Sequence, residues 1–266
     1  MPWRASLPMY NLPEMRGVNA AFWAALREEL NEPEAPEALS FDRPPVPGAI
    51  EPENLFTQVC GYPLQTIYHG QARLLGVPSY TAPHCGSGMH AGVFIVAADA
   101  PYQALEDLRG ANFVFNSVNS NSGMNLPRRA IAEIAGGGPF FASCIETHSQ
   151  PANLERVAKG EADATCVDCV TYAFFVRHRP ELGARTRILA ATPATPAIPF
   201  VTAITTPEPL ALALRAALFR VARAPRWAEV RAGLMLADIL PPETADYPLQ
   251  LRHVAEASAM GYPDLA

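Results

Sequence analysis

The sequence has 266 residues, enough for one large domain or two domains of ordinary size. Hydrophobic residues make up 49% of the chain and charged residues 17%, which describes a globular protein with a sizeable core. The net charge of −6 argues against nucleic acid as a partner, because nucleic-acid binding needs a basic face. Arg215 and Arg220 interrupt the longest apolar run, so we expect no membrane-spanning segment.

The N-terminus and the cysteines indicate the cellular compartment of the protein. Residues 1–8 lack the apolar core of a secretory signal, so the chain as written predicts a cytoplasmic protein, or a periplasmic one if a leader is missing. The five cysteines do not form a complete set of disulfide pairs. A reduced compartment is therefore the simpler expectation.

The N-terminal part is predicted to contain strands and one long helix. Apolar residues at helical spacing, including Phe22 and Leu26, predict an amphipathic helix over residues 17–30. The proline-rich segment 31–52 is expected to be a surface loop. The predicted strands of this part lie, in order, at residues 5–10, 55–59, 72–77 and 91–97.

The middle of the chain alternates predicted strands and helices, and its C-terminal third is predicted to be helical. The strands are expected at 111–115, 140–145, 162–167, 187–191 and 200–205. The helices are expected at 102–108, 128–135, 152–159, 170–178, 210–222, 227–236 and 243–259. Such alternation predicts an α/β fold with a parallel or mixed sheet covered by helices on both faces.

Two loops, at residues 82–88 and 191–199, divide the chain. If both are crossovers that form a hinge, residues 88–192 make one α/β lobe, and residues 1–87 join residues 193–266 in the other. Ligands of open α/β sheets bind where loops leave the carboxyl ends of the strands. We therefore expect a ligand cleft between two lobes.

A dense cluster of small polar residues follows the apolar strand at 113–115. Its members are Asn116, Ser117, Asn119, Ser120, Asn121, Ser122 and Asn125. A helix is predicted to start just after them, and a helix N-terminus offers unpaired N–H donors and partial positive charge. Capping a helix needs only one such residue. The pattern therefore favours a small-anion site, with simple helix capping as the alternative.

The chain resembles the phosphonate/phosphate-type (PhnD-like) substrate-binding proteins of ABC transporters, which have the type II periplasmic-binding-protein fold. The matching segments are residues 56–63, 84–90, 120–127, 162–169 and 195–200, together with His148. The resemblance implies that the Ser-rich turn holds the anionic head of a ligand. It assigns this role to Asn119, Ser120, Ser122 and Gly123, and it assigns contact with a ligand amino group to Asp168.

The same resemblance implies that the two lobes close on a small anionic ligand and that an ABC permease is a partner in transport. We expect a monomer that needs no cofactor.

Other predicted contacts lie at the end of strand 55–59. Gln58, Cys60 and Gly61 should face the cleft, although a turn set by Gly61 with a buried thiol is the alternative. Tyr10, at the end of the first predicted strand, is expected to line the same wall and stack on a ligand, or to belong to the edge of the core.

Three more contacts are predicted elsewhere. Ser87 and His90 come from the Gly/His-rich loop at 84–90, and His148 is placed to donate to a ligand oxyanion or to belong to a helix-capping turn.

Cysteine and histidine also raise the question of zinc. His84, Cys85 and His90 share one loop, and Cys166 and Cys169 form a Cys-x-x-Cys pair. A structural zinc site needs four ligands in tetrahedral reach. The period of a strand puts Cys166 and Cys169 on different faces unless a turn begins at Asp168. We therefore expect no metal.

A Cys/His enzyme is the other alternative. Cys60 or Cys85 would be the nucleophile, and His84, His90 or His148 the base. No nucleophile-elbow or triad motif accompanies them, and free cysteines are often only small buried hydrophobic residues. Ligand binding is therefore the main interpretation, and a cytoplasmic Cys/His enzyme or a ligand sensor on the same fold is the alternative.

Overall fold

The computed structural model describes residues 2–46 and 48–266. Met1, in the predicted first lobe, and Pro47, in the predicted 31–52 loop, lie outside the described residues. The chain forms two compact units. Unit 1 comprises Met1–Thr81, Gly86–Met89 and Pro196–Tyr247, and unit 2 comprises Ala82–Cys85, His90–Thr195 and Pro248–Ala266.

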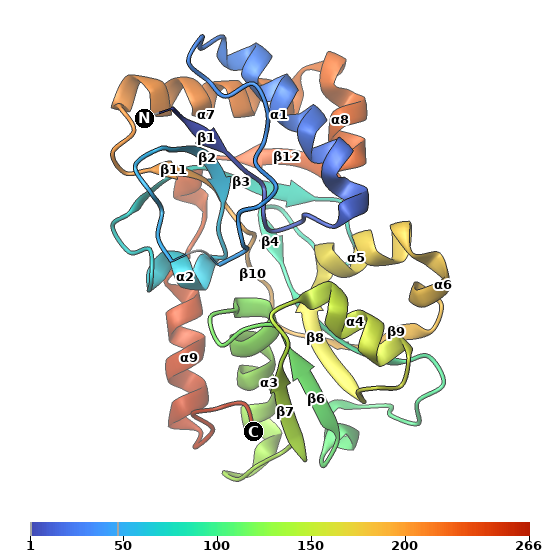
Figure 1. The fold of residues 1–266 in the computed structure, drawn as a ribbon. Coiled ribbons are helices and arrows are strands. Elements are labelled where there is room, and N and C mark those ends of the chain that lie inside the picture. Colours follow the sequence, from blue (N-terminus) through green and yellow to red (C-terminus); the bar gives the residue numbers. More distant parts are fainter. Residues whose placement is uncertain (1, 47) are drawn as a thin grey trace. The chain divides into compact units, whose positions relative to one another are not determined.

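Unit 1 is built on a mixed five-stranded sheet in the order β1-β2-β11-β3-β12. Its strands are β1 (Arg4–Ala5), β2 (Asn54–Gln58), β3 (Ala72–Tyr80), β11 (Phe200–Ala203) and β12 (Leu236–Leu240). Strand β1 is parallel to β2, and the other neighbours are antiparallel. Its helices are α1 (Arg16–Leu30), α2 (Gly61–Gln65), α7 (Glu208–Arg223) and α8 (Ala228–Gly233), of which α1, α7 and α8 pack together (Figure 1).

The apolar stripe of α1 explains how this helix docks on the sheet. Phe22 and Trp23 are almost completely buried and meet two aromatic residues of the strands. The ring of Phe22 stacks on Phe200 at 5.6 Å, and the ring of Trp23 stacks on Phe56 at 5.6 Å. Such stacked pairs stabilise beyond the area they bury. The helix ends at Asn31, which takes the left-handed conformation typical of a helix C-terminus.

Unit 2 contains a second mixed sheet, in the order β7-β6-β8-β5-β9. Its strands are β5 (Gly92–Ala97), β6 (Asn112–Phe115), β7 (Ser143–Glu146), β8 (Ala164–Asp168) and β9 (Thr186–Ala191). Strand β6 is parallel to β7 and β8, whereas β5 is antiparallel to β8 and β9. Its helices are α3 (Leu126–Ala135), α4 (Gln150–Ala158), α5 (Cys169–His178), α6 (Pro180–Gly183) and α9 (Leu249–Ala259).

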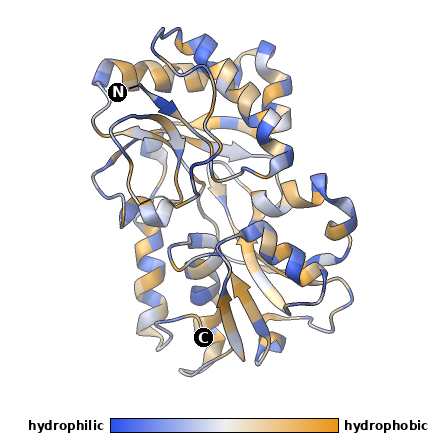
Figure 2. Ribbon diagram, viewed as in Figure 1, coloured by the Kyte–Doolittle hydropathy of each residue, from blue (hydrophilic) through white to orange (hydrophobic). Residues whose placement is uncertain are grey.

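The core of unit 2 follows the alternation of side chains along its strands. Phe94, Val96 and Phe113 pack with Ile131 of α3 and Ala257 of α9 on one face of the sheet. Helices α4 and α5 contact the sheet from the other face (Figure 1). Hydrophobic and hydrophilic residues alternate around these helices in Figure 2, as a one-sided core requires. The predicted mixed α/β class is confirmed.

Short elements complete the chain. Strands β4 (Met89–His90) and β10 (Thr195–Pro196) pair in a two-stranded ladder. The short helical turns are η1 (Pro13–Met15), η2 (Leu105–Leu108), η3 (Asn121–Asn125), η4 (Pro225–Trp227) and η5 (Pro242–Thr244). Within residues 2–46 and 48–266, no helix combines the length and the hydrophobicity that crossing a membrane requires.

Two expectations about the C-terminal third differ from the structure. The predicted helix at 227–236 ends at Gly233, and β12 follows it, because Leu236 and Ile239 pair with β3 and bury their side chains. Residues 248–266 belong to unit 2, although they were expected in the lobe formed by 1–87 and 193–266. The buried Arg128 of α3 explains this placement, since its guanidinium donates to the carbonyls of Val254 and Pro263.

Candidate functional site

The Ser/Asn-rich turn leads from β6 into α3 through the π-helical turn η3. The Gly123 N–H donates to the Ser120 hydroxyl oxygen at 3.0 Å, and the Asn125 N–H donates to the Ser120 carbonyl at 3.2 Å. All five residues of η3 are buried. π-Helical turns are uncommon and often occur at functional sites. Ser120 therefore caps a turn whose polar residues face the protein interior rather than bulk water.

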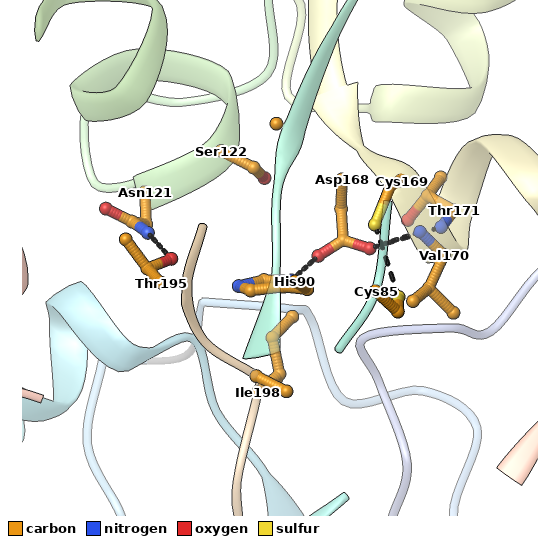
Figure 3. A network of polar contacts seen from close by, with 12 residues as sticks. Cys85, His90, Asn121, Ser122, Asp168, Cys169, Val170, Thr171, Thr195 and Ile198 are labelled. Carbon is orange, nitrogen blue, oxygen red and sulfur yellow. Dashed lines mark hydrogen bonds and ion pairs between the residues drawn. The ribbon is translucent and has the colours of Figure 1, made fainter. Parts of the chain in front are cut away.

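Several polar atoms of this turn are buried and make no hydrogen bond within the described part of the chain. They are Oδ1 of Asn116, Oδ1 of Asn121 and Nδ2 of Asn125. The other amide atom of Asn121 is used, because its Nδ2 donates to Thr195 Oγ1 at 3.1 Å (Figure 3). Leaving a buried polar atom unpaired is costly. The turn thus offers polar atoms that suit a bound molecule.

Gly123 is closely packed against two side chains of this turn. A Cβ at this position would lie 1.9 Å from Asn116 Oδ1 and 3.1 Å from Ser120 Oγ. Both distances are shorter than ordinary contacts, so a side chain here would displace Asn116 or break the Ser120 cap. The absence of a side chain lets the backbone N–H of Gly123 approach the Ser120 hydroxyl.

Gln150, the first residue of α4, connects the turn to strand β8. Its Oε1 accepts from the backbone N–H of Asp168 at 3.0 Å, and its Nε2 donates to Ser122 Oγ at 2.9 Å. The Asp168 N–H fixes the orientation of the amide, because an N–H can only donate. The hydroxyl oxygen of Ser122 is therefore used as an acceptor, and its proton remains available for another partner.

Asp168 ends β8 and caps α5. Its Oδ1 accepts from the backbone N–H groups of Val170 at 2.8 Å and Thr171 at 3.3 Å. Its Oδ2 forms an ion pair with Nδ1 of His90, and each of these two side chains is only 2% exposed. Figure 3 shows the second ring nitrogen of His90 at the end of the imidazole that points away from Asp168. The ion pair with Asp168 leaves that nitrogen unused.

The charge state of His90 follows from this pair. Burial lowers the pKa of the imidazole, but the charge of Asp168 and the hydrogen bond to it outweigh burial. The pKa of His90 is consequently raised above its ordinary value of 6.5. A buried imidazolium held by a carboxylate can donate from Nε2 with a positive charge.

The structure links His90, Ser120, Ser122, Gly123 and Asp168 in unit 2. The hydrogen bonds described above join Ser120 to Gly123 within the turn, and Ser122 through Gln150 to Asp168 and His90. The sequence pattern does not indicate two further residues that bond to this region, namely Gln150 and Thr195. The only sequence signal for Gln150 was its position directly after the Thr147-His148-Ser149 turn.

Another group of predicted contacts lies in unit 1. Gln58 is buried, and its Nε2 lies 3.4 Å from both the Tyr80 hydroxyl and the Ile198 carbonyl oxygen. The rings of Tyr10 and Tyr80 meet edge to face at 5.6 Å. Cys60 and Gly61 are buried at the start of α2. Tyr80 belongs with these residues but was not among the predicted contacts.

The remaining predicted residues are more open to solvent. Ser87 is exposed and Asn119 is half-buried. His148 follows β7 with a side chain that is 79% exposed, and its Nδ1 lies 3.6 Å from Glu146 Oε1. Its backbone φ of 63° lies in the left-handed region that few residues other than glycine adopt. These three residues are not part of the buried network.

The cysteines and histidines do not assemble into a metal site in the part of the chain that the structure describes. No group of three or more His, Cys, Asp or Glu side chains there is arranged to hold a metal ion. A turn does begin at Asp168, and it places Cys169 at the first position of α5 while Cys166 stays in the core of β8.

The chain matches a known family over most of its length. Residues 69–247 match the family described as "ABC transporter, phosphonate, periplasmic substrate-binding protein". The comparison with curated proteins gives no match.

Several solved structures share the fold. A binding-protein component of an ABC phosphonate transporter from Pseudomonas aeruginosa has a TM-score of 0.73 at 13% identity, over 97% of this chain and 92% of that chain. PhnD1 from Prochlorococcus marinus, in complex with methylphosphonate, has a TM-score of 0.71 at 12% identity, over 96% and 98%. A Xanthomonas citri protein bound to ATP has a TM-score of 0.66 at 15% identity, over 98% and 97%.

These comparisons select among the interpretations of the sequence. The two-lobed type II periplasmic-binding-protein fold is confirmed, and so is the predicted resemblance to PhnD-like proteins. The family consists of solute-binding proteins and not of enzymes, which favours ligand binding over Cys/His catalysis. The chain belongs to the family of periplasmic substrate-binding proteins of phosphonate ABC transporters.

Proposed function

We propose that this protein binds a small anion with a phosphonate- or phosphate-type head at the Ser120–Asn125 turn and His90. It would deliver this ligand, as a monomer in the periplasm, to an ABC permease. The family match supports a small ligand and a permease partner in general, and the chemistry of the turn supports the more specific ligand class.

The hydroxyl groups of Ser120 and Ser122 carry this proposal. Each oxygen accepts a hydrogen bond from the protein, from Gly123 N–H and from Gln150 Nε2 respectively. Neither hydroxyl donates a hydrogen bond within residues 2–46 and 48–266. Two hydroxyl protons are therefore left for a ligand, and a ligand that accepts from both must be rich in oxygen acceptors.

His90 adds positive charge to this set of donors. Its Nδ1 is occupied by Asp168, and its raised pKa favours the imidazolium form. An imidazolium Nε2 donates a charge-assisted hydrogen bond, which is stronger to an anion than to a neutral acceptor. Hydroxyl donors with one buried cation suit a tetrahedral oxyanion.

The predicted contacts of unit 1, Tyr10, Gln58, Cys60 and Gly61, remain part of this proposal. Their polar groups would bind the remainder of the ligand, as would Asn119, Ser87 and His148. A Gln58→Ala variant that binds the ligand as tightly as the unaltered protein would remove Gln58 from the site.

Isothermal titration calorimetry with methylphosphonate, inorganic phosphate, sulfate and acetate tests the ligand class. We expect the tetrahedral anions to bind better than acetate. Ser122→Ala should weaken binding by roughly 10-fold to 100-fold, the effect of losing a hydrogen bond to a charged group. Ser258→Ala, on the exposed face of α9, is the matched control and should bind as the unaltered protein does. Absence of binding by all four anions would refute the proposed ligand class.

A further inference from the structure

Two cysteine side chains of unit 2 lie in contact. Sγ of Cys85 is 3.4 Å from Sγ of Cys169, although 84 positions separate the two residues in the sequence. Figure 3 shows the two thiols side by side, next to the carboxylate of Asp168. Both cysteines are free thiols. Neither has a role in the ligand binding proposed above.

The backbone on each side holds these thiols in place. The Cys85 N–H donates to the Ala82 carbonyl at 3.2 Å, which closes a turn, and the Cys169 N–H donates to the Ala91 carbonyl at 3.1 Å. Cys169 is also the first residue of α5, directly after the capping residue Asp168. With both backbones held, rotation of the two side chains is the movement needed to bring the sulfur atoms together.

The two thiols differ in accessibility. Cys85 is partly exposed, whereas Cys169 is buried. The hydrogen bond with Cys85, then burial and the nearby Asp168, raise the pKa of Cys169 far above its ordinary value. Cys169 is therefore protonated in the reduced protein, and an oxidant from solution reaches the more accessible Cys85 first.

The other cysteines are poorly placed for such chemistry. Cys166 is completely buried and its pKa is raised, mainly by burial. Burial raises the pKa of Cys144 to about 11. Cys60 is buried in unit 1. Oxidation should thus be selective for the contacting pair.

We propose that Cys85 and Cys169 form an intramolecular disulfide under oxidising conditions. The thiolate of Cys85 attacks a low-molecular-weight disulfide, such as oxidised glutathione, and releases one glutathione thiol. The sulfur of Cys169 then attacks the mixed disulfide at the Cys85 sulfur, and the proton of Cys169 passes to the departing glutathione, which leaves as a thiol. The two cysteine sulfurs are oxidised by two electrons in total, and the glutathione disulfide is reduced to two thiols.

The family to which the chain belongs is periplasmic, and disulfides form and persist in that compartment. The bond would tie the segment Ala82–Cys85 to the N-terminal end of α5. Because it closes a loop of 85 residues, it would restrict the unfolded chain and raise the midpoint of thermal unfolding.

Peptide mapping of the full-length protein tests the proposal. The protein is incubated with oxidised glutathione or with dithiothreitol, free thiols are alkylated in denaturant, and tryptic peptides are analysed by mass spectrometry. Cleavage after Arg73 and Arg109 isolates Cys85, and cleavage after Lys159 and Arg177 yields one peptide with both Cys166 and Cys169. We expect a cross-link between these two peptides only after oxidation.

Single variants identify the sulfur atoms. Cys85→Ser and Cys169→Ser should abolish the cross-link, while Cys166→Ala and Cys144→Ser should retain it. A cross-link that survives Cys169→Ser, or five alkylated thiols after oxidation of the unaltered protein, would overturn the proposal.

Thermal unfolding gives a second measurement if a serine variant fails to fold. Oxidation of the unaltered protein should raise its melting temperature, and dithiothreitol should reverse the rise. The absence of a rise would count against the proposal. None of these measurements involves a ligand, so they stand apart from the proposed anion binding.

Discussion

His90 and Asp168 form a buried ion pair in which one carboxylate serves two structural elements. Oδ2 of Asp168 holds the imidazole of His90, while Oδ1 caps helix α5. Breaking a buried pair by removing one partner leaves an uncompensated charge in the interior, which costs more than the pair itself contributes. The pair therefore couples the ionisation of His90 to the stability of unit 2.

The first prediction concerns pH. The pKa of His90 is raised in the folded protein, so its contribution to stability is complete below pH 6.5, the ordinary value, and is lost as the pH rises through the raised pKa. His90→Gln should lower the free energy of unfolding by about 3 kcal/mol at pH 5.5 and by less at pH 9. Chemical denaturation at both values measures this. His148→Gln, at the exposed histidine, is the control, and an equal loss for His90→Gln at both pH values would contradict the prediction.

The second prediction concerns Gln150. Gln150→Glu keeps an oxygen for the Asp168 N–H but replaces the donor to Ser122 with an acceptor, so the Ser122 proton turns toward the glutamate. We expect an affinity loss for methylphosphonate of roughly 100-fold or more, since a hydrogen bond to the ligand is lost and a negative charge is added beside it. Gln150→Ala should lose less affinity for methylphosphonate than Gln150→Glu does.

Calorimetry of the unaltered protein, Gln150→Ala and Gln150→Glu with methylphosphonate measures whether affinity falls in that order. Gln103→Glu, which adds the same charge at an exposed position of unit 2, is the matched control. Equal affinities for Gln150→Ala and Gln150→Glu would show that Gln150 does not direct the Ser122 proton.

The third prediction concerns Gly123. Gly123→Ala places a Cβ against Asn116 Oδ1 and Ser120 Oγ. We expect a loss of about 1–3 kcal/mol in the free energy of unfolding, as for other overpacked positions. Asn116→Ala removes the nearest obstacle, so the double variant should lose less than the sum of the two single variants. Strict additivity in this double-mutant cycle would exclude the contact.

The fourth prediction concerns Glu29 of unit 1. Hydrogen bonds from Trp227 and Arg226, and from Arg220, lower its pKa from 4.5 to about 2 and outweigh the effect of its partial burial. A lowered carboxyl pKa stabilises the fold above pH 4.5, and this contribution is lost as the pH falls toward 2. Glu29→Gln should therefore cost about 1–2 kcal/mol at pH 7, after allowance for screening at a partly exposed site, and much less near pH 2. Thermal unfolding across this range measures it, with the exposed Glu28→Gln as control.

The sequence predicts the local features of the site well and the long-range ones poorly. The strand at 112–115, the Ser-rich turn and the helix that follows are evident because apolar spacing and turn chemistry are local. The hydrogen bonds from Ser122 through Gln150 to Asp168 are not evident from the sequence. They join three elements whose proximity depends on the order of strands in the sheet. The ion pair between His90 and Asp168 was missed for the same reason, although both residues were predicted contacts.

The C-terminal third shows a different limit. The sequence predicts a helix up to residue 236 where β12 begins, because Leu234, Met235 and Leu236 continue an apolar run whose period does not separate helix from strand. Pairing with β3 decides the outcome. The placement of residues 248–266 in unit 2 depends on buried contacts of Arg128, which no sequence pattern indicates.

The division of the chain has a consequence for biosynthesis. Unit 1 lacks two of its five strands until residues 196–247 have been made, and unit 2 lacks α9 until the residues after them follow. A nascent chain emerging from the ribosome therefore cannot finish one unit and then begin the other, as domains arranged in series do. Each unit stays partly formed, with hydrophobic surface uncovered, until the segment that completes it has been made, residues 196–247 for unit 1 and residues 248–266 for unit 2.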